Sequence, residues 1–231
     1  MNDVVDRDRD RGHPVRRHRP LAAGDFSVRG ALATAAALGI VSLAGAYLLE
    51  PTFGLAATTY LVLVLLYSLV LRRLPVLDVG AIAAGLVVRA VGGAVLADVK
   101  ISPWLYVGIG GVGLILALGR IQYEMRLAEA AGTLESEKYT PEAVKWMNRL
   151  AITFTLLIYC LYTFLAAPFG GGYAMMITIP FAIYAAFRYR YLTYHHGGEQ
   201  SPERLVVRDV PLMVDLGLWA LAAVIVRNLV L

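Results

Sequence analysis

The chain has 231 residues, of which 58% are hydrophobic and only 16% are charged, and its formal net charge is +4. An ordinary soluble domain carries about 25% charged residues, so this composition leaves too little polar surface to cover a soluble globule and excludes that class. The single cysteine, Cys160, excludes an intramolecular disulfide and a cysteine metal cluster. We therefore expect a membrane protein whose partner is the bilayer, with no nucleic-acid partner.

The amino-terminal segment 1–28 is polar and begins with an acidic motif that contains Asn2, Asp3, Asp6 and Asp10. On a helix, the three aspartates lie at i, i+3 and i+7 and share one face. Their carboxylates repel one another unless a cation lies among them, and Mg²⁺ is commonly shared between carboxylates and substrate phosphates. The spacing allows a Mg²⁺ site, with Asn2 as a further oxygen ligand or a donor to phosphate. A solvated tail neutralised by the interleaved arginines is the alternative.

A basic stretch follows the acidic motif and includes Arg17 and Arg19. Arginine side chains suit phosphate oxygens because the guanidinium group can donate two parallel hydrogen bonds. A positively charged flank that contacts anionic lipid headgroups has the same composition. The composition does not separate these two interpretations.

Seven stretches are long and apolar enough to cross a bilayer, which takes about 20 mostly apolar residues. They are residues 29–49, 55–71, 76–97, 103–119, 149–167, 173–190 and 210–230. The predicted fold is therefore an all-α, polytopic bundle of about seven transmembrane helices, which we treat as one domain over residues 1–231. Pro180 lies within one of these stretches and predicts a kink there.

The basic residues predict the orientation of the chain in the membrane. Four segments hold 18 of the 21 lysines and arginines: 1–29, 72–75, 119–149 and 187–208. Because positively charged loops stay in the cytoplasm, we expect segment 1–28 and the loops 119–149 and 187–208 on the cytoplasmic side of the plasma membrane. Arg89 is the exception, well inside a predicted span, and it needs an acid, backbone carbonyls or an anionic ligand as its partner.

The loop 119–149 carries a third motif, with Arg120 and Glu124 one helical turn apart and Tyr139 farther along. A structural ion pair between Arg120 and Glu124, worth a few tenths of a kcal/mol, is one interpretation. The functional interpretation assigns Arg120 to a substrate phosphate and Glu124 to ribose hydroxyls or metal-bound water. The chain has no aspartate between Asp98 and Asp209, so this loop cannot hold a second aspartate-rich metal site.

An Asn-Asp-x-x-Asp-x-x-x-Asp motif followed by a basic segment and a polytopic apolar chain resembles the UbiA superfamily of membrane prenyltransferases. The pattern from Asp10 through Arg17 and Arg19 to Gly24 looks like the decaprenyl-phosphate phosphoribosyltransferase branch. Likeness also extends over Arg89-Ala90-x-x-Gly93 and Arg208-Asp209. Where that branch has Lys in its Gly-Lys-Arg-Tyr-Ala-Glu motif, this chain has Arg120, while Glu124 is kept.

The resemblance implies transfer of 5-phosphoribose from 5-phosphoribosyl 1-diphosphate to a polyprenyl (decaprenyl) phosphate, which would supply a lipid-linked pentose donor for cell-wall arabinan. It implies that Asp3, Asp6 and Asp10 hold Mg²⁺ and act with Glu124 in catalysis. The expected substrate-binding residues are Asn2, Arg17, Arg19, Arg89, Arg120 and Tyr139. Members of this family carry further helices before the Asn-Asp motif, so we expect the chain to be a fragment with reduced activity by itself.

Two alternatives stay open. The first is a UbiA-type prenyltransferase that uses a polyprenyl diphosphate and an aromatic or glycerol-type acceptor, although such enzymes carry a second aspartate-rich motif. The second is a non-catalytic transporter or assembly subunit, for which Asp3 would be dispensable. The sequence does not indicate the oligomeric state.

Overall fold

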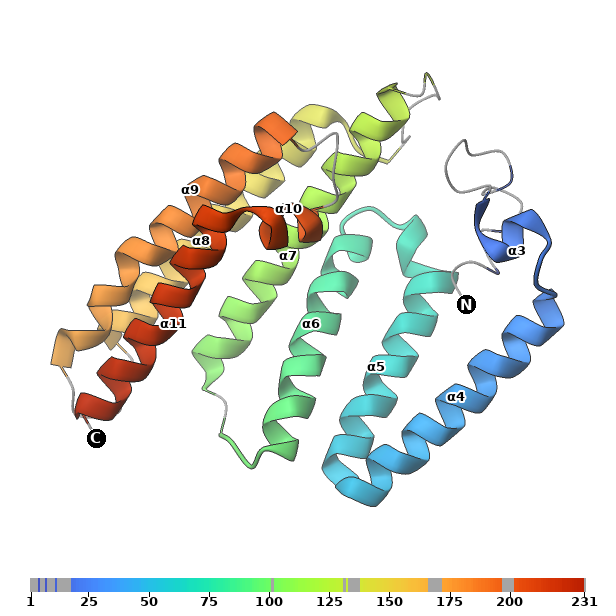
Figure 1. Ribbon diagram of the computed structural model, residues 1–231, viewed down its shortest axis with the longest axis horizontal. Coiled ribbons are helices and arrows are strands. Elements are labelled where there is room, and N and C mark those ends of the chain that lie inside the picture. Colours follow the sequence, from blue (N-terminus) through green and yellow to red (C-terminus); the bar gives the residue numbers. More distant parts are fainter. Residues whose placement is uncertain are drawn as a thin grey trace. The chain divides into compact units, whose positions relative to one another are not determined.

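The structure is a computed structural model, and every regular element in its described residues is a helix (Figure 1). It describes residues 4, 7, 11, 18–100, 102–130, 132, 138–165, 172–196 and 202–230. The chain divides into two compact units, Met1–Ile101 and Ser102–Leu231. That the two units form the single domain expected from the sequence stays a prediction.

The first unit contains a short helix followed by three long ones. Its elements are α3 (Pro20–Ala23), α4 (Val28–Leu49), α5 (Pro51–Leu69), the 3₁₀ helix η2 (Leu71–Arg73) and α6 (Leu77–Leu96). Ser27 caps α4 by accepting a hydrogen bond from the Gly30 N–H at 3.1 Å, and Pro51 starts α5, where its missing N–H costs nothing. In this unit α5 packs against both α4 and α6.

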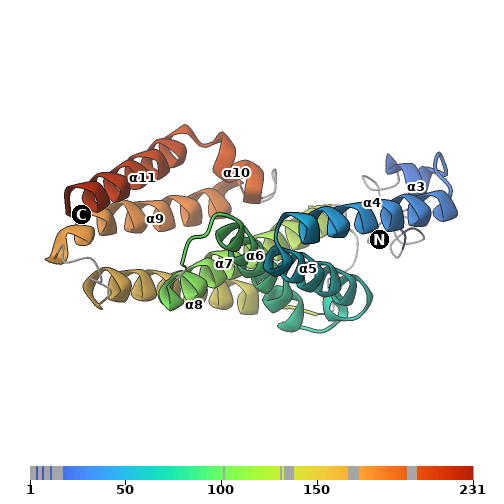
Figure 2. The ribbon, with the colours of Figure 1, turned by 90° about the horizontal axis from the view of Figure 1, so that it is seen from below.

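The second unit is built around four long helices and contains two short elements. Its elements are α7 (Pro103–Ala130), α8 (Pro141–Leu165), the 3₁₀ helix η3 (Gly172–Thr178), α9 (Ile179–His196), α10 (Pro202–Arg208) and α11 (Val210–Val230). Here α7 packs against α8, α9 packs against α11, and the short α10 contacts α7, α9 and α11. Figure 2 shows α9 and α11 side by side, with α10 connecting toward the start of α11.

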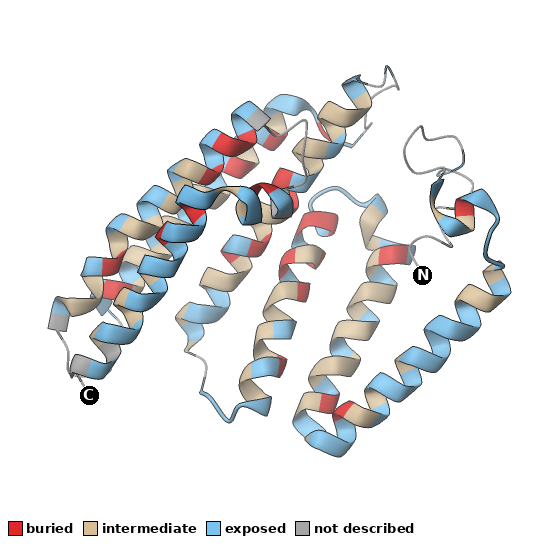
Figure 3. Cartoon of the chain, in the orientation of Figure 1, coloured by how far each residue is buried: buried red, intermediate tan, exposed pale blue. Residues whose placement is uncertain are grey.

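The helices confirm the all-α, polytopic membrane fold. Among the described residues, the five helices α4 to α8 are long and apolar enough to cross a membrane, and α11 has a shorter apolar part over Val210–Val226. Exposed apolar side chains follow α4 over most of its length (Figure 3), as expected for surface that faces lipid tails. The predicted span 173–190 corresponds to η3 and most of α9, where Arg188 and Arg190 interrupt the apolar surface.

The segments that connect the predicted spans are mostly helical in the described residues. Helix α7 continues to Ala130 and α8 begins at Pro141, so only the middle of 119–149 lies outside a helix, and α9 and α10 cover most of 187–208. Residues 119–130 are rich in Ala, Leu, Met, Glu and Arg, which are good helix formers. Pro180 lies in the first turn of α9 instead of inside a span, a position where proline interrupts no helical hydrogen bond.

The second unit contains a series of linked hydrogen bonds that joins three of its elements. The Trp219 indole N–H donates to the Tyr159 hydroxyl at 2.7 Å, and that hydroxyl lies 2.5 Å from Thr178 Oγ1. Thr178 Oγ1 donates its own proton to the Met175 carbonyl at 2.6 Å, so Tyr159 must be the donor to Thr178. These hydrogen bonds link α11 to α8 and to η3, and they satisfy polar groups for which lipid tails offer no partner.

Candidate active site

The acidic motif that the sequence analysis assigned to Mg²⁺ lies outside the described residues. This applies to Asn2, Asp3, Asp6 and Asp10, and also to Arg17. Elsewhere, within the residues that the structure describes, no group of three or more His, Cys, Asp or Glu side chains could hold a metal ion. The three carboxylates and the amide oxygen are hard oxygen donors and fit Mg²⁺ chemically. Because these residues lie outside the described part of the chain, the Mg²⁺ site stays a prediction.

The basic stretch folds back onto a short helix. Arg19 is half-buried and precedes α3, and its carbonyl accepts a hydrogen bond from the Ala23 N–H at 2.8 Å. Gly24 ends α3 with a φ of 92°, a conformation that favours glycine. The Arg11 Nε donates to the Ala22 carbonyl at 3.2 Å. The Gly24 turn and this hydrogen bond therefore hold the two arginines close to the same short helix.

Arg89 has a neutral partner inside the first unit. Its Nη2 donates to the Tyr60 hydroxyl on α5, and its guanidinium carbon lies 4.7 Å from the centre of the Tyr60 ring. The expected partner was an acid, backbone carbonyls or an anionic ligand, and the structure provides a phenol instead. Within the described part of the chain Arg89 makes no ion pair, so its charge is available to an anion.

Arg120 and Glu124 lie together on α7, as their spacing predicts. The Arg120 Nε lies 3.5 Å from Glu124 Oε1, and the two side chains are 55% and 43% exposed. An exposed pair at this distance contributes only a few tenths of a kcal/mol. A substrate phosphate could therefore engage Arg120 at little energetic cost.

Tyr139 lies just before α8 and is buried, with 9% of its surface exposed. The next residue, Thr140, caps α8 by accepting a hydrogen bond from the Ala143 N–H at 3.2 Å. This position favours a role for Tyr139 in fixing the start of α8. Its expected contact with substrate stays a prediction.

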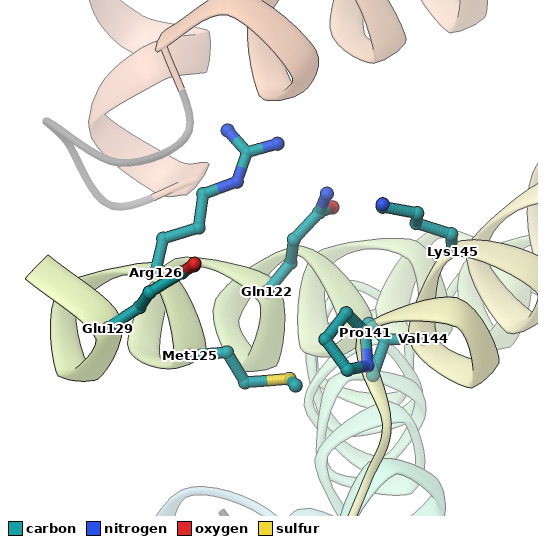
Figure 4. Close-up of a pocket in the computed structure, with 7 residues that line it drawn as sticks. All are labelled: Gln122, Met125, Arg126, Glu129, Pro141, Val144 and Lys145. Atoms are coloured by element: carbon teal, nitrogen blue, oxygen red, sulfur yellow. The ribbon is translucent and has the colours of Figure 1, made fainter. Parts of the chain in front are cut away.

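A cavity between α7 and α8 was not predicted from the sequence. The cavity measures about 120 Å³ and is lined by Gln122, Met125, Arg126, Glu129, Pro141, Val144 and Lys145. In Figure 4 the Gln122 and Lys145 side chains extend toward each other, while Arg126 reaches away from α7 toward another part of the unit. There its Nη1 donates to the Thr193 and Tyr194 carbonyls, both at 3.2 Å. Arg126 thereby ties α7 to the last turns of α9.

A second feature that was missed joins α9 to the start of α11. Asp209 accepts two hydrogen bonds from Arg188, from Nε at 3.0 Å and from Nη2 at 2.8 Å. Its Oδ1 also accepts from the Leu212 N–H at 2.9 Å, which caps α11. Asp209 belongs to the Arg208-Asp209 part of the family resemblance and has a structural role here. That role depends on its pairing with Arg188, 21 residues earlier, which the sequence alone does not show.

The structure therefore brings together only some of the expected site residues. Arg120 and Glu124 meet on α7 in the second unit, whereas Arg19 and Arg89 belong to the first unit. Convergence of residues from both units on one substrate stays a prediction.

Comparison with known proteins identifies the family. The model of the UbiA prenyltransferase family matches residues 1–206. A decaprenyl-phosphate phosphoribosyltransferase from Mycobacterium tuberculosis is 31% identical over 222 residues, which cover 95% of this chain and 73% of that protein. The protein of the same name from Corynebacterium glutamicum is 29% identical over 232 residues, with 97% of this chain and 69% of the relative covered.

Solved structures support the same fold. A UbiA homologue from Archaeoglobus fulgidus bound to GPP and Mg²⁺ superimposes with a TM-score of 0.75 at 19% identity, covering 98% of this chain and 81% of that one. The same homologue bound to DMAPP and Mg²⁺ also gives a TM-score of 0.75, at 20% identity. The chain is thus a multi-pass integral membrane protein and belongs to the UbiA prenyltransferase family.

Proposed function

We propose that this protein transfers 5-phosphoribose from 5-phosphoribosyl 1-diphosphate to a polyprenyl phosphate and releases diphosphate. The observation that carries the proposal is the exposed Arg120–Glu124 pair on α7. Arg120 is a cation that suits a phosphate group, and Glu124 is an acceptor that suits hydroxyl groups. Both lie in the segment where prenyltransferases that use a prenyl diphosphate are expected to carry aspartates. Relatives at about 30% identity that are named decaprenyl-phosphate phosphoribosyltransferases support the same substrates.

The donor substrate would be held by side chains of complementary charge. Asp3, Asp6 and Asp10, together with Asn2, would hold Mg²⁺, which would neutralise negative charge on the departing diphosphate. Arg17 and Arg19 would bind the remaining phosphate oxygens as guanidinium donors. Arg120 would bind the 5-phosphate and Glu124 would accept hydrogen bonds from the ribose hydroxyls, which fixes the sugar relative to the acceptor.

In the transfer step, an oxygen of the polyprenyl phosphate attacks ribose C1 while the bond from C1 to the diphosphate oxygen breaks. The electron pair of that bond leaves with the diphosphate. The acceptor is a phosphate monoester whose second pKa is about 6, so it is already an anion near neutral pH and needs no strong general base. Arg89 donates to the Tyr60 hydroxyl and makes no ion pair among the described residues. We therefore assign Arg89 to binding of the acceptor phosphate.

The proposal also includes the location of the reaction. We place the acidic motif, Arg120 and Glu124 on the cytoplasmic side of the plasma membrane, because most lysines and arginines flank the spans on that side. The water-soluble donor would arrive from the cytoplasm, and the polyprenyl tail would stay among the apolar helices. The product would serve cell-wall arabinan synthesis.

The test is a membrane-fraction assay with labelled 5-phosphoribosyl 1-diphosphate and a polyprenyl phosphate, with and without Mg²⁺. We expect Mg²⁺-dependent label in the lipid phase that is lost in Asp3→Asn. Arg120→Gln should also lose activity and Arg120→Lys should retain part of it, while the exposed Arg204→Gln on α10 is the matched control. Transfer from a prenyl diphosphate to an aromatic acceptor, with none from the ribosyl donor, would overturn the proposal in favour of a prenyltransferase.

A further inference from the structure

A second cavity of about 100 Å³ lies between α7, α8 and α9 and has a basic lining. It is lined by Gln122, Lys145, Asn148, Arg149, Ile152, Arg190, Thr193 and Tyr194. Three of these side chains are cations and none is a carboxylate. The cavity shares Gln122 and Lys145 with the cavity of Figure 4, so the two adjoin.

The three cations have no acidic partner in the described part of the chain. The ion pairs of Arg120 with Glu124 and of Arg188 with Asp209 do not involve Lys145, Arg149 or Arg190. The Arg149 guanidinium carbon lies 5.3 Å from the centre of the Trp146 ring, a contact that holds the side chain without neutralising it. The three side chains are exposed, and three like charges gathered around one small cavity attract an anion.

A buried amide adds a second requirement on the ligand. Asn148 lines the cavity and is only 9% exposed, and its Oδ1 has no hydrogen-bond partner among the described residues. A buried acceptor without a donor is costly, so native proteins rarely leave one unpaired. A bare phosphate diester has no proton to give it, whereas a hydroxyl group has one.

Exposed aromatic side chains belong to this cavity or to the residues next to its cations. Tyr194 lines the cavity and is 68% exposed, while Trp146 and Tyr191 follow Lys145 and Arg190 in sequence and are 61% and 50% exposed. Tryptophan and tyrosine concentrate at the depth of lipid headgroups, where one end of the ring meets lipid and the other meets water. Exposed aromatic side chains beside a basic cavity are therefore compatible with a ligand at the membrane–water interface.

The cavity faces away from the residues proposed to carry the reaction. Gln122 follows Arg120 by two residues and precedes Glu124 by two, and each step of two turns a helix by about 200°. Gln122 thus lies on the opposite side of α7 from the Arg120–Glu124 pair. A ligand in this cavity would be separate from the donor substrate.

From these observations we infer that the cavity binds a phosphate ester that carries a free hydroxyl group. Lys145, Arg149 and Arg190 hold the phosphate, and the hydroxyl donates to Asn148 Oδ1. The glycerol headgroup of an anionic phospholipid and a soluble glycerol or sugar phosphate share this chemistry. The inference does not depend on the proposed transfer reaction.

The test measures binding of two matched pairs of probes to the purified full chain in detergent. The lipid pair is dihexanoyl phosphatidylglycerol and dihexanoyl phosphatidylethanol, which differ in the headgroup hydroxyls, and the soluble pair is glycerol 3-phosphate and ethyl phosphate. We expect the hydroxyl-bearing member to bind at least about threefold more tightly. Arg149→Gln and Arg190→Gln should each weaken that binding about tenfold, because each removes charge-assisted hydrogen bonds. Arg204→Gln, an exposed change outside the cavity, should have no effect.

Asn148→Leu tests the hydroxyl separately, since it removes the unpaired amide and keeps the branched shape of the side chain. Both members of a pair should then bind equally, and the folded state should be at least as stable as before. A response in the lipid pair identifies a headgroup as the source of the ligand, and a response in the soluble pair identifies a free phosphate ester. Binding that neither arginine change weakens, in both pairs, would overturn the inference, as would equal binding of both members to the unaltered chain.

Discussion

Replacing Asp209 by alanine tests how the second unit is held together. The carboxylate accepts two hydrogen bonds from Arg188 and one from the Leu212 N–H. Loss of a helix cap costs about 1 kcal/mol. Loss of a partly buried bidentate pair costs about 2 kcal/mol, since Arg188 then has no carboxylate partner. The free energy of unfolding should fall by about 3 kcal/mol, which corresponds to a drop of about 6–12 °C in Tm for a chain of this length.

The assay is thermal unfolding of the purified protein in detergent, followed by circular dichroism. Asp209→Asn should lose less than alanine, because the amide oxygen still caps α11 while its NH₂ group cannot accept from Arg188. In a double-mutant cycle, Arg188→Gln should cost much less in the Asp209→Ala background than in the unaltered chain. Arg204→Ala on α10 is the control and should leave Tm unchanged. A loss below about 0.5 kcal/mol for Asp209→Ala, or strict additivity with Arg188→Gln, would refute this reasoning.

Two further predictions concern contacts between helices of the second unit. A Cβ at Gly111 would overlap the Thr155 side chain on α8, whereas one at Gly108 meets nothing within 4 Å, so Gly111→Leu should lower Tm by several degrees more than Gly108→Leu; equal effects would contradict the packing. Tyr159→Phe leaves the Trp219 N–H without its acceptor and should cost about 1–2 kcal/mol in the same unfolding assay. Tyr162→Phe should cost little, because the hydroxyl of Tyr162 has no hydrogen bond among the described residues and its ring contacts Tyr159.

Hydropathy predicted the membrane helices well because a bilayer imposes a simple rule on every span. The predicted stretch 29–49 became α4 (Val28–Leu49), and 76–97 became α6 (Leu77–Leu96). Hydropathy indicates only the apolar part of a helix. It therefore missed the polar extension of α7 to Ala130 and the early start of α8 at Pro141. Those turns are helical because of residue propensity and caps, such as the one that Thr140 provides for α8.

The candidate site was predictable only where its residues are close in sequence. The spacing of Arg120 and Glu124 was enough to place them on one face of a helix, and the structure confirms that they meet. Spacing could not show that Arg89 meets Tyr60 on a neighbouring helix, because that contact depends on how α5 and α6 pack. The acidic motif is a further case, since its three aspartates lie outside the described residues and their joint role depends on a tertiary arrangement.

The basic residues show what a structure adds to counting charges. Their number on one side of the membrane predicts orientation, but it treats every lysine and arginine alike. The structure gives three arginines of the second unit partners of their own: Arg120 pairs with Glu124, Arg126 with the carbonyls of α9, and Arg188 with Asp209. Lys145, Arg149 and Arg190 make no ion pair among the described residues, and all three line one cavity. Lipid headgroups in general would attract cations spread over the surface, so the gathering of these three beside a buried amide favours one bound anion.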